Sequence, residues 1–238
     1  MPRAHDSSRE EPIPAPPVFP VRINATRTIV STLGVLFAVS GINHGLFETL
    51  QGYTPTPGLF VRSIGPHQQM WRYGTEDAFT LIPNFLVSGM VAIAISLVIV
   101  VWSIWFVDRK HGSAVFLLLF ILLFVSGGGV AQVVFFTLSW VVSLRIHEPP
   151  KWPSRLLAKS ARAAFGRLWL GCLVLFTLPA LAALEIAIAG YVPGVENPEL
   201  KLHICWSLLV IGLGFLLVGI AAGFVHDQEC DVDRNPAS

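Results

Sequence analysis

The stretch from Ser113 to Ile146 reads SAVFLLLFILLFVSGGGVAQVVFFTLSWVVSLRI, an apolar run with the triplet Gly127-Gly128-Gly129 near its middle. As a single α-helix this run would measure about 50 Å at ~1.5 Å per residue, well beyond the ~30 Å hydrocarbon core of a bilayer. Glycine also weakens a helix interior. We therefore expect a hairpin that turns at the glycines, with two arms so short that the hairpin is re-entrant or crosses a thin region of the membrane.

The distribution of lysine and arginine supports this hairpin, because cytoplasmic loops of membrane proteins carry an excess of these residues. With the N-terminus inside, the hairpin places 13 of the 16 Lys and Arg residues inside and only Arg62, Arg72 and Lys201 outside. A single crossing would divide them seven against nine, with no bias. The sequence therefore favours the hairpin and predicts that both termini are cytoplasmic.

The composition of the whole chain indicates an integral membrane protein. Hydrophobic residues make up 53% of the 238 residues and charged residues 13%, whereas an average soluble domain carries ~25% charge. The net charge of +1 gives no indication of nucleic-acid binding, so the expected partner is the lipid bilayer. The three cysteines do not form a disulfide framework.

We expect an all-α fold, a helical bundle of four full spans plus the glycine-hinged hairpin, which gives five to six apolar segments. The transmembrane domain covers residues 27–227, with segments at about 28–51, 79–106, 113–146 (the hairpin), 168–190 and 203–225. Residues 1–26 are typical of a disordered proline-rich tail, and residues 228–238 form an acidic tail. Residues 153–167 predict a short basic amphipathic helix at the lipid head groups.

The first expected span ends in the stretch Gly41–Gly52, GINHGLFETLQG. His44, Glu48 and Gln51 stand at positions i, i+4 and i+7, so in a helix they share one face. The spacing Gly41-x-x-x-Gly45 lets two membrane helices approach closely. An unpaired carboxylate in hydrocarbon costs at least ~2.5 kcal/mol, so we expect this polar face to turn toward protein.

Polar residues of other segments are expected at a similar depth, in the outer half of the bundle. In the hairpin topology the first span runs outward, and the second, fourth and fifth segments each place a polar residue near the same membrane face. The candidate substrate or proton site therefore comprises His44, Glu48, Gln51, Asn84, Glu185 and His203.

Three interpretations of this cluster stay open. Polar residues near helix ends can hydrogen-bond one another and fix the packing of the helices. A histidine beside an intramembrane carboxylate can also exchange protons near neutral pH, which suits a solute or proton site. In the third interpretation, a membrane enzyme holds a metal ion with His44, Glu48, His203 or Glu185. A second close pair of ligands, as in His-Glu-x-x-His, is missing. No metal site and no cofactor is therefore predicted.

The pattern Gly41-x-x-His44-Gly45-x-x-Glu48-x-x-Gln51-Gly52, with Ile82-Pro83-Asn84 and the glycine triplet, resembles a family of small uncharacterised prokaryotic multi-pass membrane proteins. The resemblance covers about residues 28–227. It implies a location in a prokaryotic cell membrane. It brings no established activity, so it leaves the catalytic residues unknown.

The sequence thus predicts a polytopic membrane protein with a polar site in the outer half of its bundle, either transporter-like or a subunit of a membrane complex, with itself or another membrane protein as partner. The alternative is a membrane-embedded enzyme that acts on a lipid or quinone-like substrate. A transporter needs an aqueous path to His44 and Glu48. An enzyme needs a lateral opening to lipid beside titratable groups, and a structural subunit needs a closed cluster whose polar groups satisfy one another.

Overall fold

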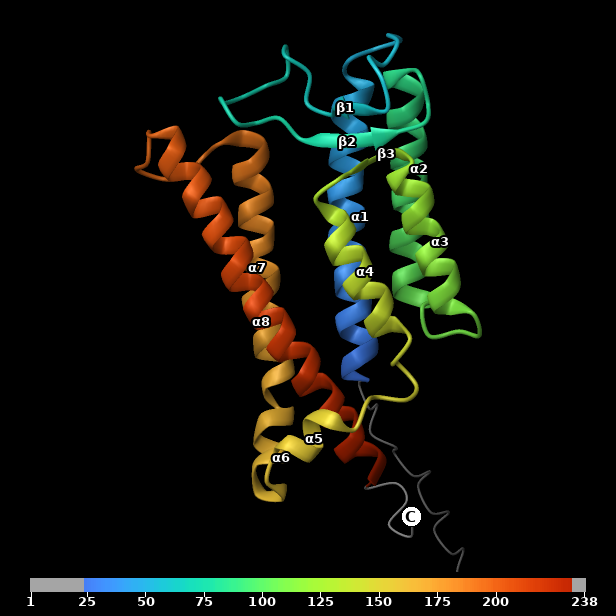
Figure 1. Ribbon diagram of the computed structural model, residues 1–238, viewed down its shortest axis with the longest axis vertical. Helices are drawn as coiled ribbons and strands as arrows, with labels where there is room; N and C mark the ends of the chain where they lie inside the picture. The colour runs from blue at the N-terminus through green and yellow to red at the C-terminus, as the bar shows by residue number, and fades with distance from the viewer. Residues whose placement is uncertain (1–23, 233–238) are drawn as a thin grey trace, which may run out of the picture.

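The computed structural model describes residues 24–232 and is mostly helical, at 67% (Figure 1). Four helices are long and apolar enough to cross a membrane, as the sequence predicts. They are α1 (Ala25–Thr49), α2 (Phe85–Trp105), α7 (Leu168–Ala189) and α8 (Pro198–Val232). The shorter helices are α3 (Gly112–Phe124), α4 (Gln132–Ser143), α5 (Trp152–Leu156) and α6 (Lys159–Gly166).

Capping residues explain why the long helices begin where they do. The Asn24 side chain accepts a hydrogen bond from the Arg27 amide at 2.7 Å, so α1 begins earlier than the expected residue 28. Asn84 caps α2 in the same way, and α2 therefore begins after the expected residue 79. Asn197 accepts from the first amides of α8, which extends well beyond the expected 203–225.

The expected tails lie largely outside the described residues. Residues 1–23 of the predicted N-terminal tail and residues 233–238 of the acidic tail are not described. The described part of the acidic tail, residues 228–232, belongs to α8.

The apolar run at 113–146 forms two short helices, α3 and α4, between which the chain reverses direction (Figure 1). The sequence predicts a simple turn at the glycines. In the structure Ser126–Gly129 instead forms a strand, β3. This strand pairs with β2 (Asp77–Thr80), which pairs in turn with β1 (Phe60–Arg62), in an antiparallel sheet of order β1-β2-β3.

The sequence predicts an all-α fold with no strand between the expected segments 28–51 and 79–106, so the small sheet is a correction. Its strands hold only three or four residues each, and β3 is almost entirely glycine, which has low strand propensity. Pairing across distant parts of the chain, such as Phe79 with Gly128, stabilises them instead. We call the end of the bundle that carries these strands the sheet end.

Helix α1 occupies the centre of the bundle and contacts α2, α4, α7, α8 and β3. Its small residues bring α2 close, because a Cβ atom at Gly45 would lie 2.6 Å from the carbonyl oxygen of Gly89. The close helix approach predicted from Gly41-x-x-x-Gly45 is therefore confirmed. The core beside α1 is aromatic, with Phe120 and Phe136 stacked at 4.0 Å between ring centroids.

Helices α7 and α8 pack along each other as a pair that meets α1 mainly at the end opposite the sheet (Figure 1). There the buried carboxylate of Asp227 on α8 accepts hydrogen bonds from the amides of Ala25 and Thr26, at 2.8 and 2.9 Å, and from the Thr26 hydroxyl at 2.6 Å. Asp227 thus caps α1 from another helix. Toward the sheet end the pair diverges from α1.

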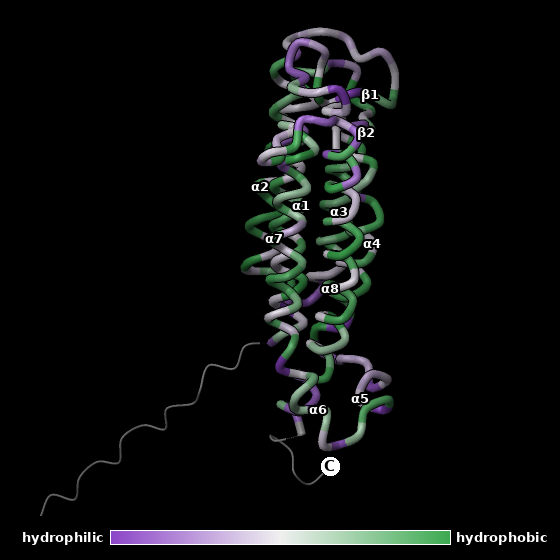
Figure 2. Tube along the Cα trace, turned by 90° about the vertical axis from the view of Figure 1, so that its left-hand side faces the viewer, coloured by the Kyte–Doolittle hydropathy of each residue, from purple (hydrophilic) through white to green (hydrophobic). Residues whose placement is uncertain are grey.

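Two polar regions bracket the apolar middle of the bundle. Figure 2 shows hydrophilic residues at the sheet end and around α5 and α6, with hydrophobic helices between them.

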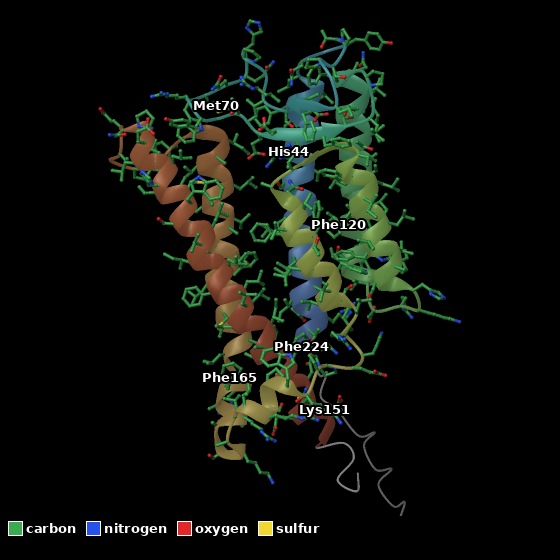
Figure 3. All side chains as sticks on the ribbon, viewed as in Figure 1. His44, Met70, Phe120, Lys151, Phe165 and Phe224 are labelled. Carbon is green, nitrogen blue, oxygen red and sulfur yellow. The ribbon has the colours of Figure 1, made fainter. Side chains whose placement is uncertain are left out.

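The predicted single helix at 153–167 is instead two, broken at Leu157 and Ala158. Helix α6 packs on α8, where Gly166 lies against His226 (Figure 3 labels the neighbouring Phe165).

Candidate functional site

The divergence of α7 and α8 from α1 leaves a cavity of about 1120 Å³, which we call the central cavity. Its volume slightly exceeds the ~300–1,000 Å³ that is usual for ligand pockets. Most of its wall is apolar, contributed by side chains of α1, α4, α7 and α8, among them Leu36, Phe37, Phe135, Phe176, Ala180 and Leu209. An apolar wall of this kind suits a hydrocarbon chain.

The polar groups of the central cavity gather at its sheet end. They come from α1, α4 and the segment between α1 and α2, and they are Ser40, His44, Gln51, Arg62, Thr75, Glu76, Asp77 and Gln132. The cavity is therefore amphipathic along its length, with hydrogen-bonding groups concentrated at one end.

His44 lies at the centre of this polar end. It is on α1 at the level of the sheet, on the side that faces α7 and α8 (Figure 3). Its side chain is only 3% exposed, and both ring nitrogens have partners: Nδ1 lies 2.7 Å from Oγ of Ser63, and Nε2 lies 2.5 Å from Oε2 of Glu76. The imidazole is therefore held on both sides, and only one of its partners, Glu76, lines the cavity.

Glu48 lies one helical turn beyond His44 and is fully buried. The Ser63 hydroxyl donates to its Oε1 at 3.3 Å. Its other oxygen, Oε2, has no hydrogen-bond partner among residues 24–232. The backbone of Gly127 in β3 covers the carboxyl group, so Glu48 is sealed from the cavity. The prediction that the polar face of α1 turns toward protein is confirmed for His44 and Glu48.

The sheet explains how Ser63 and Glu76 reach α1. Ser63 follows β1 and Glu76 precedes β2, and the Ser63 amide donates to the Glu76 carbonyl at 2.8 Å, which continues the ladder between the two strands. Gln51 then fixes the end of β1, because its amide donates to the carbonyls of Arg62 and Ser63 at 3.0 and 2.8 Å. Gln51 is thus a positioning residue for the polar end.

The charge state of Glu76 follows from its surroundings. Burial alone would raise the pKa of its carboxyl group. The hydrogen bond and the charge of His44 act in the opposite direction, and together they hold the pKa of Glu76 below its usual range. The carboxylate form therefore predominates at neutral pH, beside an imidazole that can bind a proton.

Gln132 supplies a further polar group from α4. Its side-chain amide donates to the Ser40 hydroxyl at 2.5 Å, and the residue is only 6% exposed. Its amide oxygen Oε1 has no partner within the described part of the chain, although Gln132 lines the central cavity. A buried acceptor without a donor is costly, so the hydrogen bonding of Gln132 within the described residues is incomplete.

The structure brings together only part of the predicted site. His44 and Gln51 line the cavity and Glu48 lies behind it, whereas Asn84 caps α2. Glu185 and His203 are exposed and do not line the cavity. The physical reason is helical phase: Ala183 and Ala187 line the cavity, and Glu185 lies midway between them on the opposite face of α7. Similar depth does not imply a common face.

The predicted set lacks three residues that contact the site or complete its hydrogen bonds, namely Ser63, Glu76 and Gln132. Ser63 and Glu76 carry no local signal, because their positions depend on strand pairing. Gln132 does carry one, since it is a lone amide in an apolar helix. Glu185 and His203 lie away from His44 and Glu48, so they do not supply the further ligands that a metal site would need. In residues 24–232 no group of three His, Cys, Asp or Glu side chains could hold a metal ion.

Comparisons of the chain with protein-family models, with curated proteins and with solved structures found no match.

Proposed function

We propose that the protein binds an amphiphilic molecule from the membrane, with the apolar tail of that molecule in the central cavity and its head group at His44, Glu76 and Gln132. The observation that carries this proposal is the amphipathic wall of the cavity, apolar along the helices and polar at the sheet end. An intramembrane histidine–carboxylate pair is expensive to keep in a lipid environment and is a functional-site hypothesis by default.

The route into the cavity supports a ligand that enters sideways from the bilayer. Ala131, which precedes α4, and Trp206 on α8 both line the cavity and are both exposed, so the cavity reaches the surface between these two helices, as it also does at Arg62 and Asp77 of the sheet end. Ala131 and Trp206 belong to apolar stretches of the chain. A lipid-like molecule can therefore enter without crossing water, and its tail exchanges one apolar environment for another.

The charges at the polar end favour a neutral head group that forms hydrogen bonds. Glu76 and Asp77 line this end with Arg62, so the carboxylates outnumber the one permanent cation. An anionic phosphate would meet like charge there, which costs binding free energy. A hydroxyl can instead donate to or accept from the His44–Glu76 pair, and the carbonyl oxygen of a quinone-type head group can accept a hydrogen bond there.

The same features support ligand binding over the two other predicted roles. A transporter of a water-soluble solute needs a polar path to Glu48, but the cavity wall is mainly apolar and Glu48 lies sealed behind Ser63 and Gly127. A purely structural cluster needs all its polar groups satisfied, but Oε1 of Gln132 is left without a partner in the described residues.

The test uses a long-chain alcohol that carries a photoreactive diazirine in its tail. After illumination of the purified protein, mass spectrometry should map cross-links to cavity-lining residues of α4 and α7. Ala180→Phe fills the cavity and should lower the labelling several-fold, whereas Ala182→Phe, the same change at an exposed position of the same helix, should not. Equal labelling of both variants would refute the proposal. The phosphate ester of the same alcohol should label less than the alcohol.

We also propose that α3 and α4 form a re-entrant hairpin and that α5, α6 and both termini are cytoplasmic, with the sheet end outside. The excess of Lys and Arg at the α5–α6 end supports this orientation. In a variant without the three native cysteines, an impermeant thiol reagent added to intact cells should label Gly58→Cys and not Ser160→Cys, both at exposed positions. Labelling of Ser160→Cys would overturn this orientation.

A further inference from the structure

We infer that Glu76, His44, Ser63 and Glu48 form a proton relay that leads from the wall of the central cavity to a sealed carboxyl group. The four side chains are joined in series by three contacts, at 2.5 Å between Glu76 and His44, 2.7 Å between His44 and Ser63, and 3.3 Å between Ser63 and Glu48. The proposed function assigns the ligand at the cavity end of this relay, but the relay itself follows from the contacts alone.

The number of protons in the relay follows from counting donors. Three contacts in series need three hydrogens, one for each hydrogen bond. The Ser63 hydroxyl supplies one, and a neutral imidazole of His44 supplies a second. With both glutamates ionised, one contact would therefore join two acceptors with no hydrogen between them. The relay is fully hydrogen-bonded only when it holds one additional proton, on His44 or on one of the two carboxyl groups.

This additional proton can occupy either end without breaking the chain of hydrogen bonds. In one arrangement Glu76 holds it and donates to Nε2 of His44, Nδ1–H donates to Ser63, and Ser63 donates to an ionised Glu48. In the other arrangement Glu48 holds it and donates to Ser63, Ser63 donates to Nδ1, and Nε2–H donates to an ionised Glu76. Both arrangements contain the same atoms and the same total charge.

Three proton hops connect the two arrangements. The proton of Glu76 passes to Nε2 of His44, the Nδ1 proton passes to Oγ of Ser63, and the hydroxyl proton of Ser63 passes to Oε1 of Glu48. Each hop breaks one N–H or O–H bond and forms another, so no co-reactant is needed. The contact between Ser63 and Glu48 is the longest of the three, and we therefore assign the limiting hop to Ser63.

The two ends of the relay differ in what they can reach. Glu76 lines the cavity, where a bound head group can give or take a proton, and the charged residues Asp77 and Arg62 and the Cys205 thiol of α8 line the same cavity. Ser63 and Glu48 are both fully buried and do not line the cavity. The hydroxyl of Ser88 on α2 also lies beside Glu48, but its own partners are Thr80 and the Ser126 carbonyl, and none of these three residues lines the cavity. Protons therefore reach Glu48 through His44 and Ser63.

The relay gives the proposed site an acid–base role. A head group with an exchangeable proton can pass it to Glu76, and transfer along the relay returns Glu76 to its carboxylate form while the proton rests at Glu48. The reverse sequence supplies a proton to the ligand. The expected ligand class is therefore narrower than a neutral amphiphile, since its head group should carry a titratable hydroxyl, as a phenol or a quinol does.

The first test counts the protons of the relay in the ligand-free protein, so its outcome does not depend on the proposed function. Magnetic resonance of the protein with labelled histidine and glutamate should show one additional proton in the relay at neutral pH. Spectra of Glu48→Gln and Glu76→Gln assign the glutamate signals. The additional proton will lie on the His44 imidazolium or on a protonated Glu48 or Glu76. A neutral imidazole beside two ionised glutamates would overturn the relay.

The second test measures the path to Glu48. If Glu48 is protonated, infrared spectroscopy after transfer into heavy water measures the rate of hydrogen–deuterium exchange at its carboxyl group, whose band is identified by its loss in Glu48→Gln. If Glu48 is ionised, the same spectroscopy measures the rate at which a downward pH jump protonates it. Ser63→Ala should slow this exchange by about tenfold or more, which corresponds to one raised barrier along the path. Ser63→Thr keeps the hydroxyl and should restore the wild-type rate. Unchanged exchange in a folded Ser63→Ala protein would mean another path and overturn the relay.

Discussion

Gly127 lies directly against the carboxyl group of Glu48. A Cβ atom at Gly127 would stand 2.5 Å from Oε2 and 2.7 Å from Oε1, and the φ angle of Gly127 is +109°, a region that residues with side chains rarely adopt. The glycine triplet therefore does more than reverse the chain. It lets the backbone of β3 cover a buried carboxyl group on α1.

Gly127→Ala should therefore destabilise the protein, because the new methyl group meets Glu48 and the backbone conformation becomes strained. Strain of this kind costs about 1–3 kcal/mol, to which the steric overlap adds. Thermal unfolding in detergent measures the effect. Gly171→Ala is the matched control, since nothing lies within 4 Å of a Cβ atom there and alanine favours helix. Equal melting temperatures for the two variants would contradict the assignment.

Asp227 joins α8 to the first turn of α1, so its removal should loosen the two groups of helices where they meet. Asp227→Ala leaves the amides of Ala25 and Thr26 without an acceptor, and we expect a loss of about 1–3 kcal/mol in the free energy of unfolding. Asp231→Ala removes an exposed carboxylate from the same helix and should be nearly neutral. A chemical or thermal unfolding series compares them, and equal stabilities would refute the role of Asp227.

The lowered pKa of Glu76 predicts how stability changes with acid. A carboxyl group whose pKa is lower in the folded state than its ordinary value of 4.5 contributes stability that is fully present above that value. The contribution is lost as the pH falls through the lower, folded pKa. Melting temperatures of wild type and Glu76→Gln should therefore converge below about pH 4.5 and differ most at higher pH. Glu185→Gln, at an exposed position, should show no such convergence.

Residues 71–73 bridge the sheet end of the cavity to the α7–α8 pair. The Trp71 indole donates to the Ala187 carbonyl at 3.0 Å, and the Tyr73 hydroxyl donates to Glu199 at 2.5 Å. The hydrogen bond to Glu199 raises the pKa of Tyr73 above its usual value. These contacts hold the open side of the two helix groups together, so their loss should widen access to the cavity.

Trp71→Ala should accordingly speed the reaction of Cys205, which lines the cavity, with a maleimide. Loss of one hydrogen bond of about 1 kcal/mol predicts a rise of roughly fivefold. The measurement uses a background of Cys172→Ser and Cys230→Ser, so that only Cys205 reacts. Trp105→Ala, at an exposed position on α2, serves as the control. An unchanged rate in Trp71→Ala would show that these contacts do not limit access.

The sequence alone determined the helical membrane class, the long apolar helices and the inward face of α1. These follow from local rules: the length of an apolar run, the cost of a carboxylate in hydrocarbon, and the spacing of residues on a helix. The reversal of the 113–146 run belongs here too, because a run too long for one span and interrupted by three glycines has few other conformations. None of these inferences needs knowledge of a distant contact.

Only the tertiary structure decided the composition of the site. Ser63 and Glu76 reach His44 because β1 and β2 pair, and Glu48 is sealed because β3 pairs with β2; no local pattern encodes any of these pairings. Helical phase excludes Glu185 from the site, because Ala183 and Ala187 of α7 line the cavity instead. Strand pairing and helix rotation are long-range properties that depend on packing, so the sequence located the polar face of α1 but not the partners that give it chemistry.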